Sequence, residues 1–137
     1  MSKQIMQYML SKYLESPQYK YIVWAYGFHG HRKSNFIKIM AALRELKAEF
    51  DFMPIILTCD LDENIKRMKC DNRDEARIDG AIRNTRTIYD EYPFPFVDIT
   101  NLSIKETVDE LKEITIKPSS LGYSFCRMKF AKPRKDT

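Results

Sequence analysis

Short apolar segments alternate with segments of helical periodicity along most of this chain, and the alternation limits the folds that it can adopt. Three apolar segments have the length of buried strands: residues 20–26, 52–59 and 96–100. Apolar side chains at three-and-four spacing predict helices around and between them, at residues 3–15, 35–50, about 60–70, 75–90 and 103–111. Strands separated by helices join through right-handed crossovers into a parallel sheet covered on both faces. The sequence therefore predicts a three-layer α/β/α fold.

Two of the predicted helices begin with the spacing of a capping box. Asp60 is followed three residues later by Glu63, and Ser103 is followed in the same way by Glu106. In a capping box the first side chain accepts a hydrogen bond from the backbone N–H three residues on, and the acidic side chain bonds back. Helices are therefore expected to start directly after residues 60 and 103.

The predicted sheet has few strands for its type. Three parallel strands leave two open edges, and a sheet buried on both faces normally has more strands. Either the first helix shields one edge, or a partner supplies further strands. A homo-oligomer and a different protein partner both satisfy the second alternative.

Charge is concentrated at the end of the chain. The net charge is +4, and the last residues contribute much of it, because five basic side chains there face only Asp136: Arg127, Lys129, Lys132, Arg134 and Lys135. We therefore divide the chain into an α/β domain, residues 1–116, and a basic C-terminal tail, residues 117–137. The domain itself is close to neutral, which does not favour nucleic acid as a partner and suits a small phosphate-bearing molecule equally well.

The cysteines and the hydropathy pattern indicate in which cellular compartment the protein is expected. Cys59, Cys70 and Cys126 are odd in number and lack metal-ligand spacing, which argues for a reducing environment and against a metal site. No segment approaches the roughly 20 apolar residues that span a bilayer, and the first residues do not resemble a signal peptide. A cytoplasmic protein without a membrane partner is expected.

The order of motifs from Tyr21 to Leu111 points to a family. The strand ILTCD is followed by a helix with Lys66-Arg67-Met68, a charged segment Arg73-Asp74-Glu75-Ala76-Arg77, and the strand FVDIT. This order resembles the second half of the P-loop kinases that act on nucleosides, nucleotides and small hydroxyl substrates, including shikimate-kinase-like and AAA-type small kinases. The resemblance implies a P-loop NTPase-like fold truncated at its N-terminus, with the first strand and the phosphate loop upstream of Met1.

The same resemblance assigns roles to three arginines. In these kinases the segment that follows the strand corresponding to ILTCD is a lid. Its arginines close over the ATP phosphates, and Arg67, Arg73 and Arg77 occupy the matching positions. Arginine suits that role because its planar fork of donors matches phosphate oxygens and stays charged. The residues also permit a second interpretation, a solvated helix face with local ion pairs to nearby carboxylates, namely Asp71, Asp74 and Glu75.

The phosphate loop is where the chain departs from the family. A Walker loop reads GxxxxGK[ST], and the nearest string runs from Gly27 to Ser34, which makes Gly27, Lys33 and Ser34 the candidate cofactor-binding residues. Its sixth position holds Arg32, although that position needs the backbone freedom of Gly and a close approach to phosphate.

The sequence thus predicts a nucleotide or small-molecule kinase-like protein with an impaired or inactive site. The implied cofactors are ATP and Mg²⁺, and the implied reaction is phosphoryl transfer to a small hydroxyl or phosphate acceptor. Whether the chain is an enzyme stays open. The alternative is a non-enzymatic protein-interaction module derived from a kinase fold.

Overall fold

A computed structural model describes residues 2–46 and 50–116 in full and the backbone of residues 128–129. The chain divides into two compact units, Met1–Phe52 with Met128–Thr137 and Met53–Arg127. No break in the hydrophobic pattern marks this division. The predicted tail, residues 117–137, lies outside the described residues except for the backbone of two of them.

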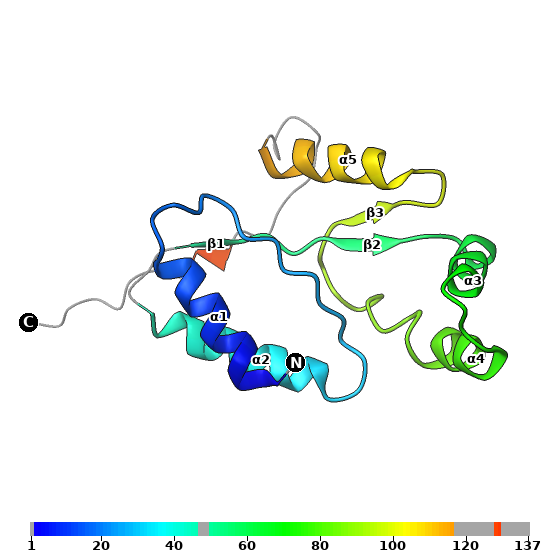
Figure 1. Ribbon diagram of the computed structural model, residues 1–137, viewed down its shortest axis with the longest axis horizontal. Helices are drawn as coiled ribbons and strands as arrows, with labels where there is room; N and C mark the ends of the chain where they lie inside the picture. The colour runs from blue at the N-terminus through cyan, green and yellow to red at the C-terminus, as the bar shows by residue number, and fades with distance from the viewer. Residues whose placement is uncertain (1, 47–49, 117–127, 130–137) are drawn as a thin grey trace, which may run out of the picture. The chain divides into compact units, whose positions relative to one another are not determined.

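The first unit is built on two packed helices, α1 (Lys3–Glu15) and α2 (Arg32–Arg44), which lie side by side in Figure 1. Helix α1 has the predicted bounds, and the Ser2 hydroxyl caps it by accepting from the Ile5 N–H. Buried side chains from both helices form the core of this unit: Leu10, Ile39, Met40 and Leu43. Two short strands, β1 (Asp51–Phe52) and β4 (Met128–Lys129), pair antiparallel.

The strand predicted at residues 20–26 is not formed, and that prediction was wrong. The segment has no regular secondary structure, and Val23 is 94% exposed. Trp24 instead stacks on Phe36 of α2, with ring centroids 5.6 Å apart, and Tyr26 donates its hydroxyl to a carbonyl of α2. An extended segment lying on a helix alternates its side chains as a strand does, so the pattern alone could not distinguish the two.

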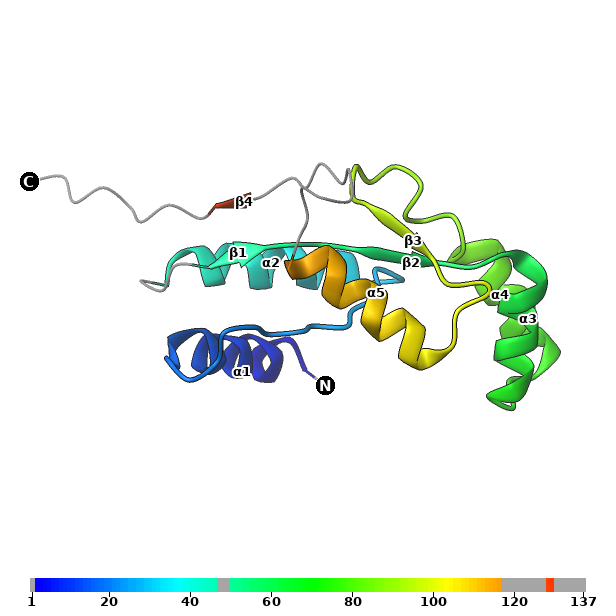
Figure 2. The same cartoon turned by 90° about the horizontal axis from the view of Figure 1, so that it is seen from above.

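The second unit contains a parallel pair of strands. Strand β2 (Ile56–Thr58) pairs with β3 (Phe96–Asp98), and both strands point toward α3 (Leu61–Cys70) in Figure 1. Helix α4 (Glu75–Asn84) follows α3, and α5 (Ile104–Ile116) runs back beside the strands in Figure 2. The described residues are therefore of mixed α and β class with a parallel sheet, as expected. That sheet has two strands here, where three were predicted.

Both predicted helix starts form, but only the second capping box is complete, because the Asp60 N–H donates to the Thr100 hydroxyl instead of to Glu63. The Asp60 carboxylate accepts from the Glu63 N–H at 2.8 Å, and α3 starts at the next residue. At α5 the bonds are reciprocal: the Glu106 N–H donates to the Ser103 hydroxyl at 3.2 Å, and the Ser103 N–H donates to the Glu106 carboxylate at 2.8 Å. Local side-chain chemistry was therefore enough to place these helix starts.

Several predicted boundaries differ from the structure, among them the end of α2, at Arg44 where residue 50 was predicted, and the end of α5, at Ile116 where residue 111 was predicted. The strand predicted at 52–59 is divided between two sheets around Pro54, which has no N–H to donate to a ladder. Helix α2 starts at Arg32, directly after a turn in which Gly30 has a φ of +58°. Helix α4 ends at Asn84, and turns follow it where helix was predicted to residue 90.

Helix α3 ends in a Schellman motif that connects it to α4. The Arg73 N–H donates to the Met68 carbonyl, the Asn72 N–H donates to the Lys69 carbonyl, and Asn72 has a φ of +57°. The Asp74 side chain then caps α4 by accepting from the Arg77 N–H at 2.8 Å. The corner between the two helices is therefore held at both of its ends.

In the part of the chain that the structure describes, no helix combines the length and the apolarity needed to cross a bilayer.

The left-handed backbone at Asn72 makes the corner sensitive to side-chain shape. Asn72→Val is expected to lower the free energy of unfolding by about 1–2 kcal/mol, because a β-branched side chain is strained in this conformation. Asn72→Gly should be neutral or slightly stabilising, because Gly adopts the same angles without strain. Urea denaturation followed by circular dichroism measures both variants. Equal losses for Val and Gly would contradict the motif.

Candidate functional site at the carboxyl ends of β2 and β3

The ends of the two parallel strands are joined by a short chain of hydrogen bonds. The Asp98 carboxylate accepts from the Thr100 N–H at 2.9 Å and from its hydroxyl at 2.5 Å. The Thr100 hydroxyl oxygen in turn accepts from the Asp60 N–H at 2.9 Å. These donors favour the ionised form of Asp98, the hydroxyl most strongly, and lower the pKa of its carboxyl below the ordinary value. The N-cap of α3 is thereby fixed to the end of β3.

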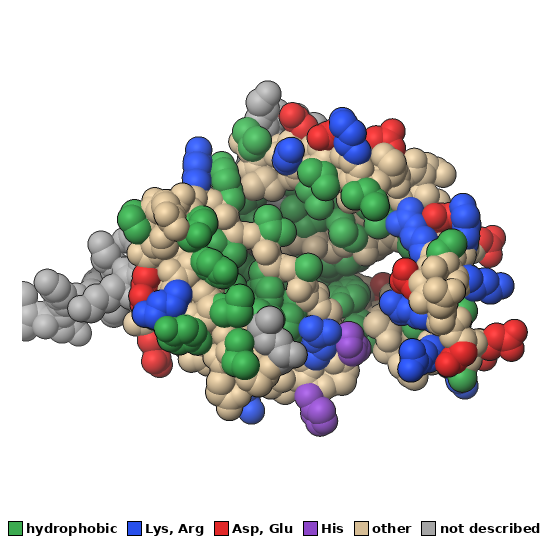
Figure 3. All heavy atoms as spheres, in the orientation of Figure 1, with side chains coloured by type: hydrophobic (Ala, Val, Ile, Leu, Met, Phe, Trp, Pro, Cys, Tyr) green, Lys and Arg blue, Asp and Glu red, His purple; other side chains and the backbone are tan. Residues whose placement is uncertain are grey.

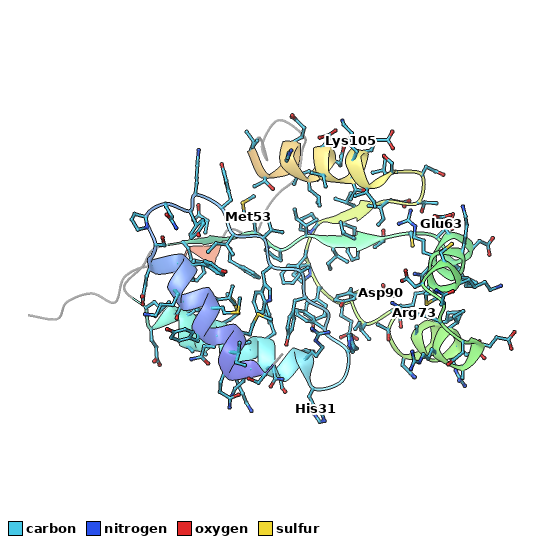
Figure 4. All side chains as sticks on the ribbon, viewed as in Figure 1. His31, Met53, Glu63, Arg73, Asp90 and Lys105 are labelled. Carbon is cyan, nitrogen blue, oxygen red and sulfur yellow. The ribbon has the colours of Figure 1, made fainter. Side chains whose placement is uncertain are left out.

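Arg67 lies on α3 and reaches the same place. Its Nε donates to a Glu63 carboxylate oxygen at 2.8 Å, and its Nη2 donates to the Ile99 carbonyl at 2.9 Å. The bond between Arg67 and Glu63 is the main reason why the pKa of Glu63 is lowered and that of Arg67 is raised. Figure 4 shows Glu63 on α3, near the end toward which the strands point. Two of the Arg67 nitrogen atoms are thus occupied within the protein.

A second arginine, Arg86, binds the neighbouring strand end. Its Nη2 donates to the Cys59 carbonyl at 2.9 Å, and its Nη1 lies 3.4 Å from the Asn64 side-chain oxygen. Sequence reasoning did not place this residue in the site, because in a helix that continues to residue 90 its arginines lie off the apolar face. The early end of α4 turns the side chain toward the strands instead. No motif in the sequence could have indicated this contact.

Arg73 and Arg77, the other two predicted lid arginines, lie at the corner between α3 and α4. Their side chains are 47% and 76% exposed, and their ion pairs are long: 3.7 Å from Arg73 to Asp71 and 3.8 Å from Arg77 to Asp74. Figure 4 shows Arg73 at the junction of the helices, and Figure 3 shows basic and acidic side chains intermingled over both. Local ion pairs therefore exist, as the second interpretation of this segment expected, but exposed pairs of this length are weak.

The candidate phosphate-loop residues belong to the first unit. Lys33 and Ser34 lie in the first turn of α2, and the Ser34 hydroxyl donates to the His31 carbonyl at 2.9 Å. The guanidinium of Arg32 lies over the Tyr26 ring, 4.7 Å from its centroid. The positive φ of this turn falls on Gly30, while Gly27 precedes the turn. Gly27, Lys33 and Ser34 thus precede and open a helix, as in a phosphate loop, but Arg32 packs on an aromatic ring at the position that needs Gly.

The described residues form no metal-binding cluster, and comparisons with known proteins found no match. Across the described ranges, no three His, Cys, Asp or Glu side chains gather in a way that could hold a metal ion. No family model matches the sequence, and neither a curated protein nor a solved structure was found to be similar to it.

The hydrogen bonds to Asp98 predict a dependence of stability on pH. Because the folded-state pKa of Asp98 lies below its unfolded value, the ionised carboxyl stabilises the fold above the unfolded pKa, and this stability is lost as pH falls through the folded pKa. The free energy of unfolding should therefore fall between about pH 5 and pH 2. Asp98→Asn should make that fall shallower, because the amide cannot ionise.

Urea denaturation at a series of pH values measures this slope. Asp109→Asn is the matched control, because Asp109 lies on the exposed surface of α5 and, among the described residues, its ion pair is with Lys105 of the same helix. Superimposable pH profiles for Asp98→Asn and the parent chain would show that the Asp98 bonds contribute nothing.

Proposed function

We propose that the chain is a kinase-like phosphate-binding protein, and that the order β2, α3, α4, β3, α5 is part of a three-layer, P-loop NTPase-like fold. The ligand class is a nucleotide or another small phosphate-bearing molecule. In its complete form such a site would transfer a phosphoryl group from ATP with Mg²⁺ to a small hydroxyl or phosphate acceptor.

One observation carries this proposal: two exposed arginines stand on a rigid corner at the end of α3, the helix that follows strand β2 of the parallel pair. Ligands of α/β proteins bind outside the carboxyl ends of parallel strands, where the following loops and helices begin. Arg73 and Arg77 lie at the opposite end of the helix that starts there, on the segment that the family resemblance assigns to a lid, and they are held by the Schellman motif of α3 and the Asp74 cap of α4. Their long ion pairs can be exchanged for shorter, charge-assisted bonds to phosphate oxygens.

The structure of residues 27–34 does not favour catalysis, because this segment does not fit a triphosphate well. A phosphate loop presents backbone N–H groups around the ligand, and Gly allows the close approach. Here Arg32 fills that position, and its carbonyl accepts the Tyr26 hydroxyl at 3.1 Å while its guanidinium covers the same ring. We therefore propose that the chain binds phosphate with impaired or absent turnover.

Titration calorimetry with sodium tripolyphosphate and with MgATP tests the proposal. The parent chain should bind tripolyphosphate with a millimolar dissociation constant, and MgATP no more tightly, because the arginines contact only phosphate. Arg73→Ala combined with Arg77→Ala should weaken tripolyphosphate binding by about tenfold or more, since each lost charge-assisted bond contributes on the order of 1 kcal/mol.

The matched control removes one positive charge elsewhere in the same unit. Lys105→Ala on α5 should change the tripolyphosphate affinity by less than about twofold, because screening weakens charges farther away than the Debye length. Absence of any tripolyphosphate binding would refute the proposal. A micromolar dissociation constant for MgATP would instead show that the segment from Gly27 to Ser34 acts as a phosphate loop.

A second candidate, the protein-interaction module, is favoured by the outer surface of α1. This surface exposes large apolar side chains, with Tyr8 64% exposed, beside Ile5 and Tyr13. Light scattering over a range of concentrations discriminates the candidates: an interaction module that pairs with itself should gain mass with concentration, and Tyr8→Ser should suppress the gain. A constant monomer mass together with tripolyphosphate binding favours the kinase-like protein.

A further inference from the structure

We propose that Arg67 and Arg86 are positioning residues: each guanidinium holds the backbone carbonyl that follows one of the two parallel strands, and together they fix the start of α3, the helix that ends at the corner with Arg73 and Arg77. The ligand in this inference, a phosphate-bearing molecule, rests on the proposed function. The positioning role itself rests only on the hydrogen bonds described below. The inference also changes the role of Arg67, for which the family resemblance implied contact with phosphate.

The two arginines make equivalent contacts from different elements. Arg67 on α3 donates to the carbonyl of Ile99, directly after β3. Arg86, in the turns after α4, donates to the carbonyl of Cys59, directly after β2, at the same distance of 2.9 Å. Each strand end is therefore bound by a side chain that comes from outside the strand pair.

Each contact is reinforced by a second acceptor. Glu63, one turn before Arg67 on α3, accepts its Nε at 2.8 Å, which orients the plane of the guanidinium. Asn64, the next residue of α3, lies 3.4 Å from Arg86. The first turn of α3 is thus bonded to both guanidinium groups, and this turn begins at Asp60, whose N–H is bonded to Thr100.

The exposed Arg73 and Arg77 differ from Arg67 and Arg86 in their contacts, which supports a ligand-binding role for the first two and a positioning role for the other two. The bonds of Arg67 and Arg86 to carbonyls are short and partly buried, and breaking either one loses a hydrogen bond from a charged donor, although the Ile99 carbonyl also accepts from the Leu102 N–H at 3.2 Å. The ion pairs of Arg73 and Arg77 exceed hydrogen-bond length and face water. A phosphate ligand can therefore recruit Arg73 and Arg77 easily, whereas recruiting Arg67 would disrupt the end of β3.

Amide hydrogen exchange of the full chain, followed residue by residue by NMR, tests the positioning role. Arg67→Lys and Arg86→Lys keep the charge but lose the planar fork of donors. Exchange at the Asp60 amide should become about tenfold faster in both variants, through local opening of the strand ends. The Ile78 amide, within α4, should keep its rate. Tripolyphosphate affinity should change by less than about twofold, because the charge near the site is kept.

Two results would overturn the inference. A loss of tripolyphosphate affinity of about tenfold in Arg67→Lys, with unchanged exchange at Asp60, would make Arg67 a ligand contact. An equal acceleration at Asp60 and Ile78 would show that the arginines contribute only to overall stability. If the parent chain binds no tripolyphosphate, the proposed function fails, while the exchange rates still decide the positioning role.

A milder variant covers the case in which the arginine variants do not fold. Asn64→Ala removes only the longer of the two Arg86 contacts and should accelerate exchange at Asp60 by a smaller factor, about twofold to threefold. Ser11→Ala on α1 is its control, because that hydroxyl donates to the Tyr8 carbonyl of its own helix, in the first unit. Indistinguishable exchange at Asp60 in Asn64→Ala and Ser11→Ala would count against the positioning role.

Discussion

The carbonyl groups at the ends of the parallel strands are the constraint on which the second unit depends. Where a strand stops, its last carbonyls lose their ladder partners and must find other donors or water. Here Arg67 and Arg86 supply them, and the Thr100 hydroxyl accepts the nearby N–H of Asp60. Because these side chains come from α3, the turns after α4 and the loop after β3, the same bonds that satisfy the backbone also join those elements.

Local chemistry in the sequence predicted the helices well. The apolar spacing placed α1 at its observed bounds, and the Asp60 and Ser103 capping boxes placed the starts of α3 and α5. These signals succeed because a helix is stabilised by residues three and four positions apart, which a single sequence shows directly. The strands were predicted less well, because their partners lie far away in the sequence: Trp24 found an aromatic partner on α2, and Pro54 separated one predicted strand into two.

In the candidate site, too, local features could be predicted from the sequence and long-range contacts could not. Lys33 and Ser34 were expected at a helix start and stand in the first turn of α2, while Arg73 and Arg77 were expected on a charged segment and lie at an exposed corner. The partners of Arg67 and Arg86 could not be foreseen, because they are backbone carbonyls 32 and 27 residues away. Residue identity carries no information about a carbonyl, so such contacts become visible only when the chain is folded.

The Schellman corner at Asn72 also sets an angular relation. Because successive residues of an α-helix are rotated by about 100° around its axis, one residue inserted between the Asp74 cap and Arg77 would turn that arginine to a different side of α4. The corner fixes where α4 starts, so the helix could not absorb the insertion by shifting its first residue. The direction in which Arg77 points thus depends on the number of residues between Asp74 and Arg77. Insertions or deletions between these two residues should be far less tolerated than substitutions.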